Sequence, residues 1–226
     1  MDYNDIIKIH KKYNDRVVKD RFESYCRNLI LPDIYSCNNG KILVDLACGH
    51  GMVSKFFIDL GYKVYGVEID EAMAKLAEER GVKIQIQDIQ SSLNIKDNFT
   101  DEVFWGDNIE HLYCPEAVIK EISRILKPNG RLIISTVNYS NIIWRLKYLF
   151  SGRIPLSESG DTNKNVGYWE HIRLWNDDEL VNFICGFGFF YKHTYGTNYF
   201  GIFPKFFYKK FPKQFSGVNI YEFIKI

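Results

Sequence analysis

The chain lacks paired cysteine motifs, an excess of charge of one sign, long apolar runs, internal repeats and low-complexity linkers. Its five cysteines are odd in number and show no C-x-x-C spacing; they stand at positions 26, 37, 48, 114 and 185. A secreted disulfide framework usually has an even number of cysteines at regular spacings. We therefore expect reduced thiols in a cytoplasmic protein.

The formal net charge is only +1, which gives no overall attraction to DNA, RNA or acidic partners. No window approaches the length of a transmembrane helix, and the polar start at residues 1–5 does not resemble a signal peptide. The length of 226 residues and the 46% hydrophobic content fit one soluble α/β domain over residues 1–226. The abundance of Ile, Lys and Asn is typical of an AT-rich, bacterial genome.

The most informative segment begins with the apolar run 42–46, which suits a parallel strand covered on both faces. A turn of small residues follows, and a helix begins near Met52. Gly49 and Gly51 let the backbone approach a ligand, and the first N–H groups of the helix can meet an anionic group. The next strand, 64–68, ends in Glu68, whose carboxylate can accept hydrogen bonds from a ribose diol. These features predict a nucleoside-containing cofactor.

The turn itself favours one cofactor. A dinucleotide fingerprint requires a third glycine, but Ser54 stands there. The pattern Asp45-x-Ala47-x-Gly49-x-Gly51 resembles motif I of the class I S-adenosylmethionine-dependent methyltransferases, usually D/E-x-G-x-G-x-G. Ala47 replaces the first glycine, where a longer side chain is implausible. The alternative interpretation is a strand-to-helix turn that binds no ligand.

The following segments extend the resemblance, which is strong over residues 41–136. Residues 84–89 are similar to the third strand, and by this resemblance Asp88 and Ile89 contact the adenine, while Ile69 follows the ribose-binding Glu68. Three further elements are a fourth strand over 99–105, a helix over 117–126, and a fifth strand over 131–136 after a turn at 127–130. The run 121–136 resembles the family block E-x-x-R-x-L-K-P-G-G.

The resemblance implies a Rossmann-like, seven-stranded methyltransferase sheet, mostly parallel with the last strand antiparallel, and helices on both faces. Residues 1–35 are expected to form an N-terminal helical cap; in it Tyr13 or Arg16 could reach the methionine end, or simply pack. Residues 137–172 are expected to form a lid or substrate insertion. Asn176-x-x-Glu179 predicts a capping box opening a helix that runs to Cys185. A sixth strand begins after the glycines at 186 and 188, and the last covers 218–223.

Catalytic residues are expected after the fourth strand and in the segment 137–172. His111 is a candidate base because its ordinary pKa of about 6.5 lies near neutrality; it could instead hydrogen-bond the loop backbone. Asp107, Glu110 and His111 resemble the metal motif of small-RNA 2′-O-methyltransferases and ubiquinone-pathway O-methyltransferases. His171 falls where the RNA enzymes place a further histidine ligand. These four residues could hold Mg²⁺, Mn²⁺ or Zn²⁺, although related sequences without a metal share the motif. Asp107 is also a candidate for cofactor binding.

Two segments bear on the substrate. Tyr168 could wall a pocket, and Arg173 could pair with a phosphate or carboxylate or instead form a salt bridge that fixes the lid. The aromatic-basic segment 196–216 could meet a membrane surface or an acidic partner through residues 203–213. Its two prolines argue against a regular helix, so we expect a substrate-side loop there.

The resemblance implies methyl transfer from S-adenosylmethionine to an oxygen. Residues 106–109 do not match the N/D-P-P-Y motif of many N-methyltransferases. We expect an O-methyltransferase acting on a hydroxyl or phosphate-type oxygen of a small polar metabolite, such as a sugar or nucleotide-linked precursor of a surface glycan or specialised metabolite. One alternative is a metal-dependent 2′-O-methyltransferase of RNA or a quinone-pathway O-methyltransferase. RNA is disfavoured by the near-neutral charge. A second alternative is a non-catalytic cofactor-binding regulator.

Overall fold

A computed structural model describes residues 30–38, 40–152, 171–197 and 203–226. Tyr13 and Arg16 of the predicted cap, and Tyr168 of the predicted lid, lie outside these residues. Among the described helices none is long and apolar enough to cross a bilayer.

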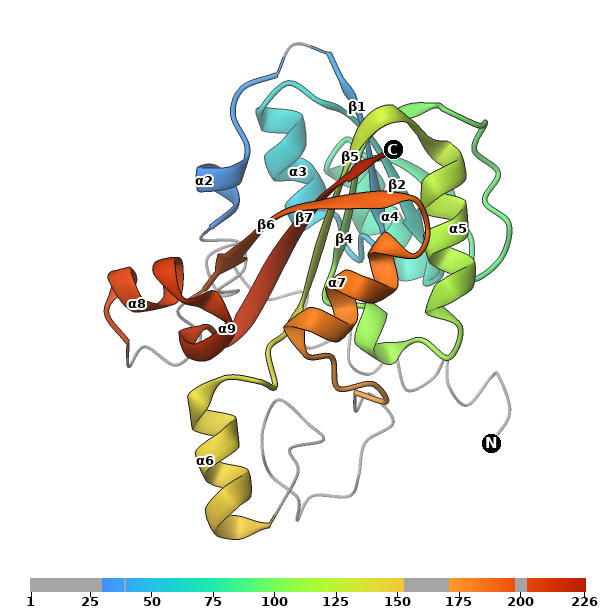
Figure 1. Cartoon of the computed structure of the whole chain (residues 1–226). Coiled ribbons are helices and arrows are strands. Elements are labelled where there is room, and N and C mark those ends of the chain that lie inside the picture. The colour runs from blue at the N-terminus through green and yellow to red at the C-terminus, as the bar shows by residue number, and fades with distance from the viewer. Residues whose placement is uncertain (1–29, 39, 153–170, 198–202) are drawn as a thin grey trace.

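Seven strands form one sheet in the order β3-β2-β1-β4-β5-β7-β6 (Figure 1). The strands β1 to β5 run parallel, and β7 lies antiparallel between β5 and β6. The predicted sheet, mostly parallel with an antiparallel last strand, is therefore confirmed. The strands are β1 Ile42–Leu46, β2 Lys63–Glu68, β3 Lys83–Ile86, β4 Thr100–Gly106, β5 Leu126–Val137, β6 Phe189–Gly196 and β7 Val218–Lys225.

Helices cover both faces of the sheet, as expected (Figure 1). Successive strand side chains point to opposite faces, so Val103 and Trp105 of β4 pack on one face and Phe104 on the other. The first face is covered by α5 and α7, the second by α2, α3 and α8. The helices are α2 Leu31–Ile34, α3 Met52–Asp59, α4 Glu71–Glu79, the 3₁₀ helix η2 Ile109–His111, α5 Pro115–Ile125, α6 Ile142–Ser151, α7 Asp177–Cys185, α8 Lys205–Lys210 and α9 Pro212–Phe215.

The start of α7 shows how closely a local pattern can specify structure. The Asn176 side chain accepts a hydrogen bond from the backbone N–H of Glu179 at 2.9 Å, and the Glu179 carboxylate accepts one from the N–H of Asn176 at 3.4 Å. Both bonds satisfy N–H groups that have no partner inside the helix. The predicted capping box, and the predicted helix end at Cys185, are confirmed.

Three expectations about local structure need correction. The third strand ends at Ile86, so Asp88 and Ile89 follow it. The predicted turn 127–130 lies inside β5, because Leu126 already pairs with Thr100 before a register shift. Residues 196–216 contain the helices α8 and α9 rather than a continuous loop. Their prolines stand at helix starts, where a missing N–H costs no hydrogen bond. In addition, α6 lies within the predicted insertion 137–172.

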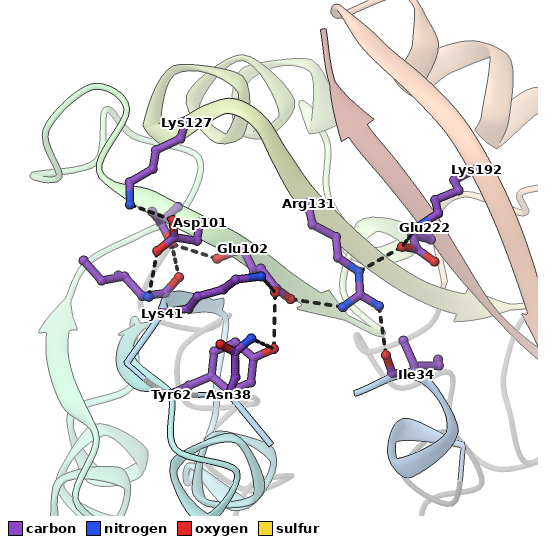
Figure 2. A network of polar contacts seen from close by, with 12 residues as sticks. Ile34, Asn38, Lys41, Tyr62, Asp101, Glu102, Lys127, Arg131, Lys192 and Glu222 are labelled. Atoms are coloured by element: carbon purple, nitrogen blue, oxygen red, sulfur yellow. Dashed lines mark hydrogen bonds and ion pairs between the residues drawn. The ribbon is translucent and has the colours of Figure 1, made fainter. Parts of the chain in front are cut away.

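A half-buried cation joins the parallel and antiparallel parts of the sheet (Figure 2). The Arg131 guanidinium on β5 pairs with Glu102 on β4 at 3.2 Å and with Glu222 on β7 at 3.0 Å. It also donates to the backbone carbonyl of Ile34 at 3.1 Å and lies 4.6 Å from the centre of the Tyr35 ring. Both carboxylates are about 3% exposed, so each depends on a cation to offset its lost hydration.

Replacing Arg131 by Met should lower the free energy of unfolding by about 3 kcal/mol, because two buried carboxylates lose a shared cation. Urea denaturation of the purified protein measures this. The matched control is Lys127→Met, which breaks the more exposed pair with Asp101 and should cost less than about 1 kcal/mol. Equal losses in the two variants would contradict the importance of the buried pairs.

The same network predicts that the free energy of unfolding falls at acidic pH. Burial raises the pKa of Glu222, but the Tyr195 hydroxyl, the Lys192 ammonium and the Arg131 guanidinium outweigh it and hold the pKa below the ordinary 4.5. The stabilisation is therefore present above pH 4.5 and is lost as the pH falls through the lower pKa of the folded state. Between those values, the unfolding free energy of wild type should fall more steeply than that of Glu222→Gln. Parallel curves in denaturant titrations at several pH values would refute this.

Candidate active site

The predicted site residues follow the strands that end at one edge of the sheet. The carboxyl ends of neighbouring parallel strands meet there, and ligands of open α/β sheets bind at that edge. The residues are Ala47 to Gly51 after β1, Glu68 and Ile69 at the end of β2, Asp88 and Ile89 after β3, and Asp107 to His111 after β4. The sheet therefore gathers segments that are far apart in the sequence.

The turn after β1 uses its small residues in different ways. Ala47 and Gly49 have φ angles of +53° and +54°, the left-handed region that side chains disfavour. A Cβ added at Gly49 would meet nothing within 4 Å, so the backbone there borders open space that a ligand can enter. A Cβ at Gly51 would lie 2.8 Å from Ala77 of α4. Gly51 is therefore needed for close packing rather than for approach to a ligand.

Asp45, predicted to bind the cofactor, is buried at the end of β1. Its carboxylate accepts a hydrogen bond from the hydroxyl of Ser54 at 2.5 Å, and Ser54 is fully buried in α3. Ser54 stands where a dinucleotide motif has its third glycine. Its hydrogen bond to Asp45 connects β1 to α3. In this structure, Asp45 fixes the position of the turn through its hydrogen bond to Ser54.

Glu68 holds the same turn from the neighbouring strand. Its carboxylate accepts hydrogen bonds from the backbone N–H groups of Gly49 at 2.8 Å, Ile69 at 2.8 Å and Asp70 at 2.9 Å. Burial raises the pKa of Glu68, although these three bonds oppose the shift. A carboxylate has about four acceptor positions, so about one is left for a ligand hydroxyl.

The residues expected around an adenine differ in exposure. Asp88 is half-buried, and its carboxylate accepts from the backbone N–H of Gln90 at 2.9 Å. Ile89 is buried in the apolar core beside α5, whereas Ile69 is 39% exposed. A role of Ile89 in contacting the adenine stays a prediction.

After β4, three of the four candidate metal ligands come together. The ligand atoms of Glu110, His111 and His171 all lie within 4.8 Å of one another, and Glu110 and His171 are buried. The Nε2 atom of His171 is 4.0 Å from the Glu110 carboxylate, and the two imidazole rings are 4.7 Å apart. The backbone carbonyl of Glu110 accepts from the N–H groups of Ile172 and Arg173, at 3.0 and 3.1 Å, which fixes the two segments together.

Asp107 is not part of this cluster. Its backbone has a φ of +48°, its N–H donates to the carbonyl of Ser135 at 2.9 Å, and its carboxylate accepts from the Ser135 hydroxyl at 2.5 Å. The side chain is therefore fixed against β5. The structure thus brings three of the four expected ligands within 4.8 Å of one another, and the metal site itself stays a prediction.

Sequence reasoning missed Tyr139. Its hydroxyl is hydrogen-bonded to Nδ1 of His171, which leaves Nε2 of that ring on the side of Glu110. Burial lowers the pKa of His171 below the ordinary 6.5, and the negative charge of Asp107 only partly opposes this. The imidazole is thus neutral at pH 7, the form that binds a metal or accepts a proton. The one signal in the sequence was the position of Tyr139 just after the fifth strand.

Arg173 has a structural role in the described residues. Its guanidinium donates to the backbone carbonyls of Leu112 at 3.1 Å and Tyr113 at 2.8 Å. These bonds hold the segment after β4 against the segment that carries His171. They favour the alternative that Arg173 fixes the lid, although through backbone carbonyls rather than a salt bridge.

Comparison with known families identifies the domain. Residues 44–134 match a family model described as a methyltransferase domain, and the match begins in β1 and ends in β5. The matched residues are thus similar to a methyltransferase domain, in agreement with the predicted resemblance to the class I S-adenosylmethionine-dependent methyltransferases. The matched region contains the turn after β1 and the segment after β4.

Curated proteins and solved structures agree with this assignment. The ubiquinone biosynthesis O-methyltransferase of Idiomarina loihiensis is 31% identical over 113 residues, which are 47% of this chain and 46% of that protein. The chain thus spans about half the length of the curated relatives it matches.

Among solved structures, one from Thermotoga maritima is named a methyltransferase, possible histamine N-methyltransferase; it has a TM-score of 0.67, 20% identity and full coverage of both chains. A methyltransferase from Mesorhizobium loti has a TM-score of 0.64 and 14% identity, over 90% of this chain and all of that one. At these identities the two structures show the fold alone.

Replacing Glu68 by Gln tests whether this carboxylate holds the turn after β1 and binds the cofactor. The amide would present a donor to the N–H of Gly49, so we expect a loss of about 1–3 kcal/mol in stability, together with at least tenfold weaker binding of S-adenosylhomocysteine. Thermal unfolding and calorimetry measure the two effects. The matched control Asp88→Asn keeps an acceptor for Gln90, so it should leave stability unchanged and weaken binding less. Unchanged binding in Glu68→Gln would contradict this role.

Proposed function

We propose that the protein transfers a methyl group from S-adenosylmethionine to a hydroxyl oxygen of a small molecule. The observation that carries the proposal is the cluster of Glu110, His111 and His171 at the carboxyl end of β4. Methyl transfer from a sulfonium is an in-line displacement, so the protein must align the acceptor and exclude water. A hydroxyl acceptor also needs help in losing its proton, which is what a cluster of imidazoles and a carboxylate can provide.

The residues around the turn after β1 fit the cofactor. The open space beside Gly49 admits the ligand, the remaining acceptor position of Glu68 suits a ribose hydroxyl, and Asp88 suits the adenine amine. When bound, S-adenosylmethionine supplies an electrophilic methyl group. The protein's own contribution is to fix the cofactor at the ends of β1 and β2, which the hydrogen bond between Gly49 and Glu68 holds together.

The cluster after β4 also fits a divalent cation. One carboxylate and two imidazoles are ligands that Zn²⁺, Mn²⁺ or Mg²⁺ accept in proteins, with the softer ions favouring the imidazoles. A divalent cation supplies Lewis acidity that lowers the pKa of an acceptor hydroxyl. Tyr139 orients His171 and keeps its Nε2 atom directed toward Glu110. The Tyr139 hydroxyl thus has the position of an outer partner that fixes a ligating histidine.

For the acceptor, the comparisons favour the quinone-pathway alternative over the sugar or nucleotide-linked metabolite that we expected first. The curated relatives named above are ubiquinone biosynthesis O-methyltransferases. Arg173, the candidate for a substrate phosphate, already donates to two backbone carbonyls. We therefore place the hydroxyl of a quinone-pathway intermediate before that of a sugar or nucleotide-linked metabolite. The cluster argues against a non-catalytic regulator, because binding the cofactor alone does not require it.

The reaction is tested with labelled S-adenosylmethionine and two acceptor panels, catechols and nucleotide sugars. We expect methylation of a catechol hydroxyl, inhibition by a chelator, and recovery with Mn²⁺, Mg²⁺ or Zn²⁺. His171→Ala should lower turnover by roughly 10²–10⁴ without recovery by metal, while cofactor affinity stays unchanged. Tyr139→Phe should weaken metal affinity by about 10–100-fold. The control His193→Ala, on β6, should behave as wild type.

Two outcomes would overturn parts of the proposal. Activity that resists a chelator and disappears in His111→Ala would replace the metal by a histidine base. Binding of the cofactor without transfer to either panel, in wild type supplied with metal, would support a regulator instead of an enzyme.

A further inference from the structure

Positive charge is concentrated on three helices outside the site. The helices α6, α8 and α9 contain no Asp or Glu, whereas the whole chain has a net charge of only +1. α6 contacts α9; in Figure 1, α8 and α9 lie at the left of the molecule and α6 at its bottom, all three away from α5. Their cations are Arg145, Lys147, Lys205, Lys209, Lys210 and Lys213. We call this region the α6–α9 surface.

Large apolar side chains are exposed on the same surface. On α6, Leu149 and Phe150 are 72% and 83% exposed. On α8 and directly after it, Phe206 and Phe211 are 59% and 42% exposed, and their rings lie 6.5 Å apart. The rings of Phe206, Phe211 and Phe215 form one group, since Phe211 is also 6.4 Å from Phe215 of α9. Such a group of exposed aromatic residues marks an interaction site.

The cations stand next to these rings. The Lys210 ammonium lies 5.3 Å from the centre of the Phe206 ring and 5.7 Å from that of Phe211. Within the described part of the chain, no ion pair is found for Lys205 or Lys210, whereas Lys209 pairs with Asp33 at 2.6 Å. An aromatic residue with an adjacent lysine suits an interface that is apolar on one side and anionic on the other.

A cavity opens beside the rings. It has a volume of about 250 Å³ and is bounded by β6, α8 and α9. Its lining includes Lys209, Lys210 and Lys213 together with Asp177, whose carboxylate is 3.5 Å from the Lys213 ammonium. Because Phe211 and Lys210 also line it, the cavity and the exposed rings belong to one surface. Lys209 pairs with Asp33, and Lys213 pairs with Asp177 and Asp178. Lys210 is therefore the lining lysine of the described residues that can meet an anionic group.

We propose that the α6–α9 surface docks on an anionic membrane, with its aromatic and leucine side chains in the interface and its lysines on the lipid headgroups. A second copy of this chain is disfavoured, because two such surfaces would place like charges together. A lipid bilayer offers anionic groups and an apolar layer side by side, which matches the arrangement of lysines around rings. The inference does not depend on the proposed reaction.

The experiment is sedimentation of the full-length protein with phosphatidylcholine vesicles that contain or lack phosphatidylglycerol. We expect binding to the anionic vesicles that weakens as salt is added. Lys205→Ala with Lys210→Ala should lower the partition coefficient roughly 30-fold, since each basic residue near the surface contributes about 1 kcal/mol. Phe206→Ser with Phe211→Ser should lower it more than tenfold. These side chains are exposed, so melting temperatures should stay unchanged.

Matched controls are Phe190→Ser, which removes a 63% exposed ring on β6, and Lys75→Ala, which removes an exposed lysine on α4. Both should bind vesicles as wild type does. Equal binding by wild type and by all variants, or no binding to anionic vesicles, would overturn the proposal. A dimer in light scattering that the phenylalanine variants abolish would assign the surface to a second copy instead. Binding of S-adenosylhomocysteine should be the same in all variants, which separates this test from that of the reaction.

Discussion

The arrangement of the sheet depends on the half-buried guanidinium of Arg131. It stands where the parallel strands meet the antiparallel β7, and it neutralises Glu102 and Glu222, which would be costly to bury alone. Because these residues lie near the amino ends of β4 and β5, the network is at the end of the sheet opposite the site.

At the carboxyl end, buried carboxylates organise the backbone before any ligand arrives. Asp45 connects β1 to α3 through Ser54, and Glu68 ties β2 to the turn at Gly49. Each bond satisfies a polar group that burial has removed from water. The same groups therefore serve the fold and the cofactor site, so substitutions there should affect both. In the proposed site the cofactor would meet a turn whose backbone is already held by these hydrogen bonds, which lowers the cost of ordering it.

The two proposals meet in one segment of the chain. Tyr139 follows β5 and bonds His171 of the acceptor cluster, and α6 of the charged surface begins shortly after it. A membrane-docked surface next to the proposed acceptor side would suit an acceptor that partitions into lipid. The corrected role of Arg173 agrees with this, because its guanidinium holds backbone carbonyls rather than standing free for a phosphate.

The sequence by itself determined the elements whose signals are local. Apolar runs predicted the core strands, the small residues from 47 to 51 predicted the turn, and Asn176 with Glu179 predicted the start of α7, because each signal acts through a few neighbouring residues. The tertiary structure decided which side chains meet: Ser54 with Asp45, and Tyr139 with His171. It also excluded Asp107 from the ligand cluster. These partners lie on different elements, and only the order and twist of the strands bring them within hydrogen-bonding distance.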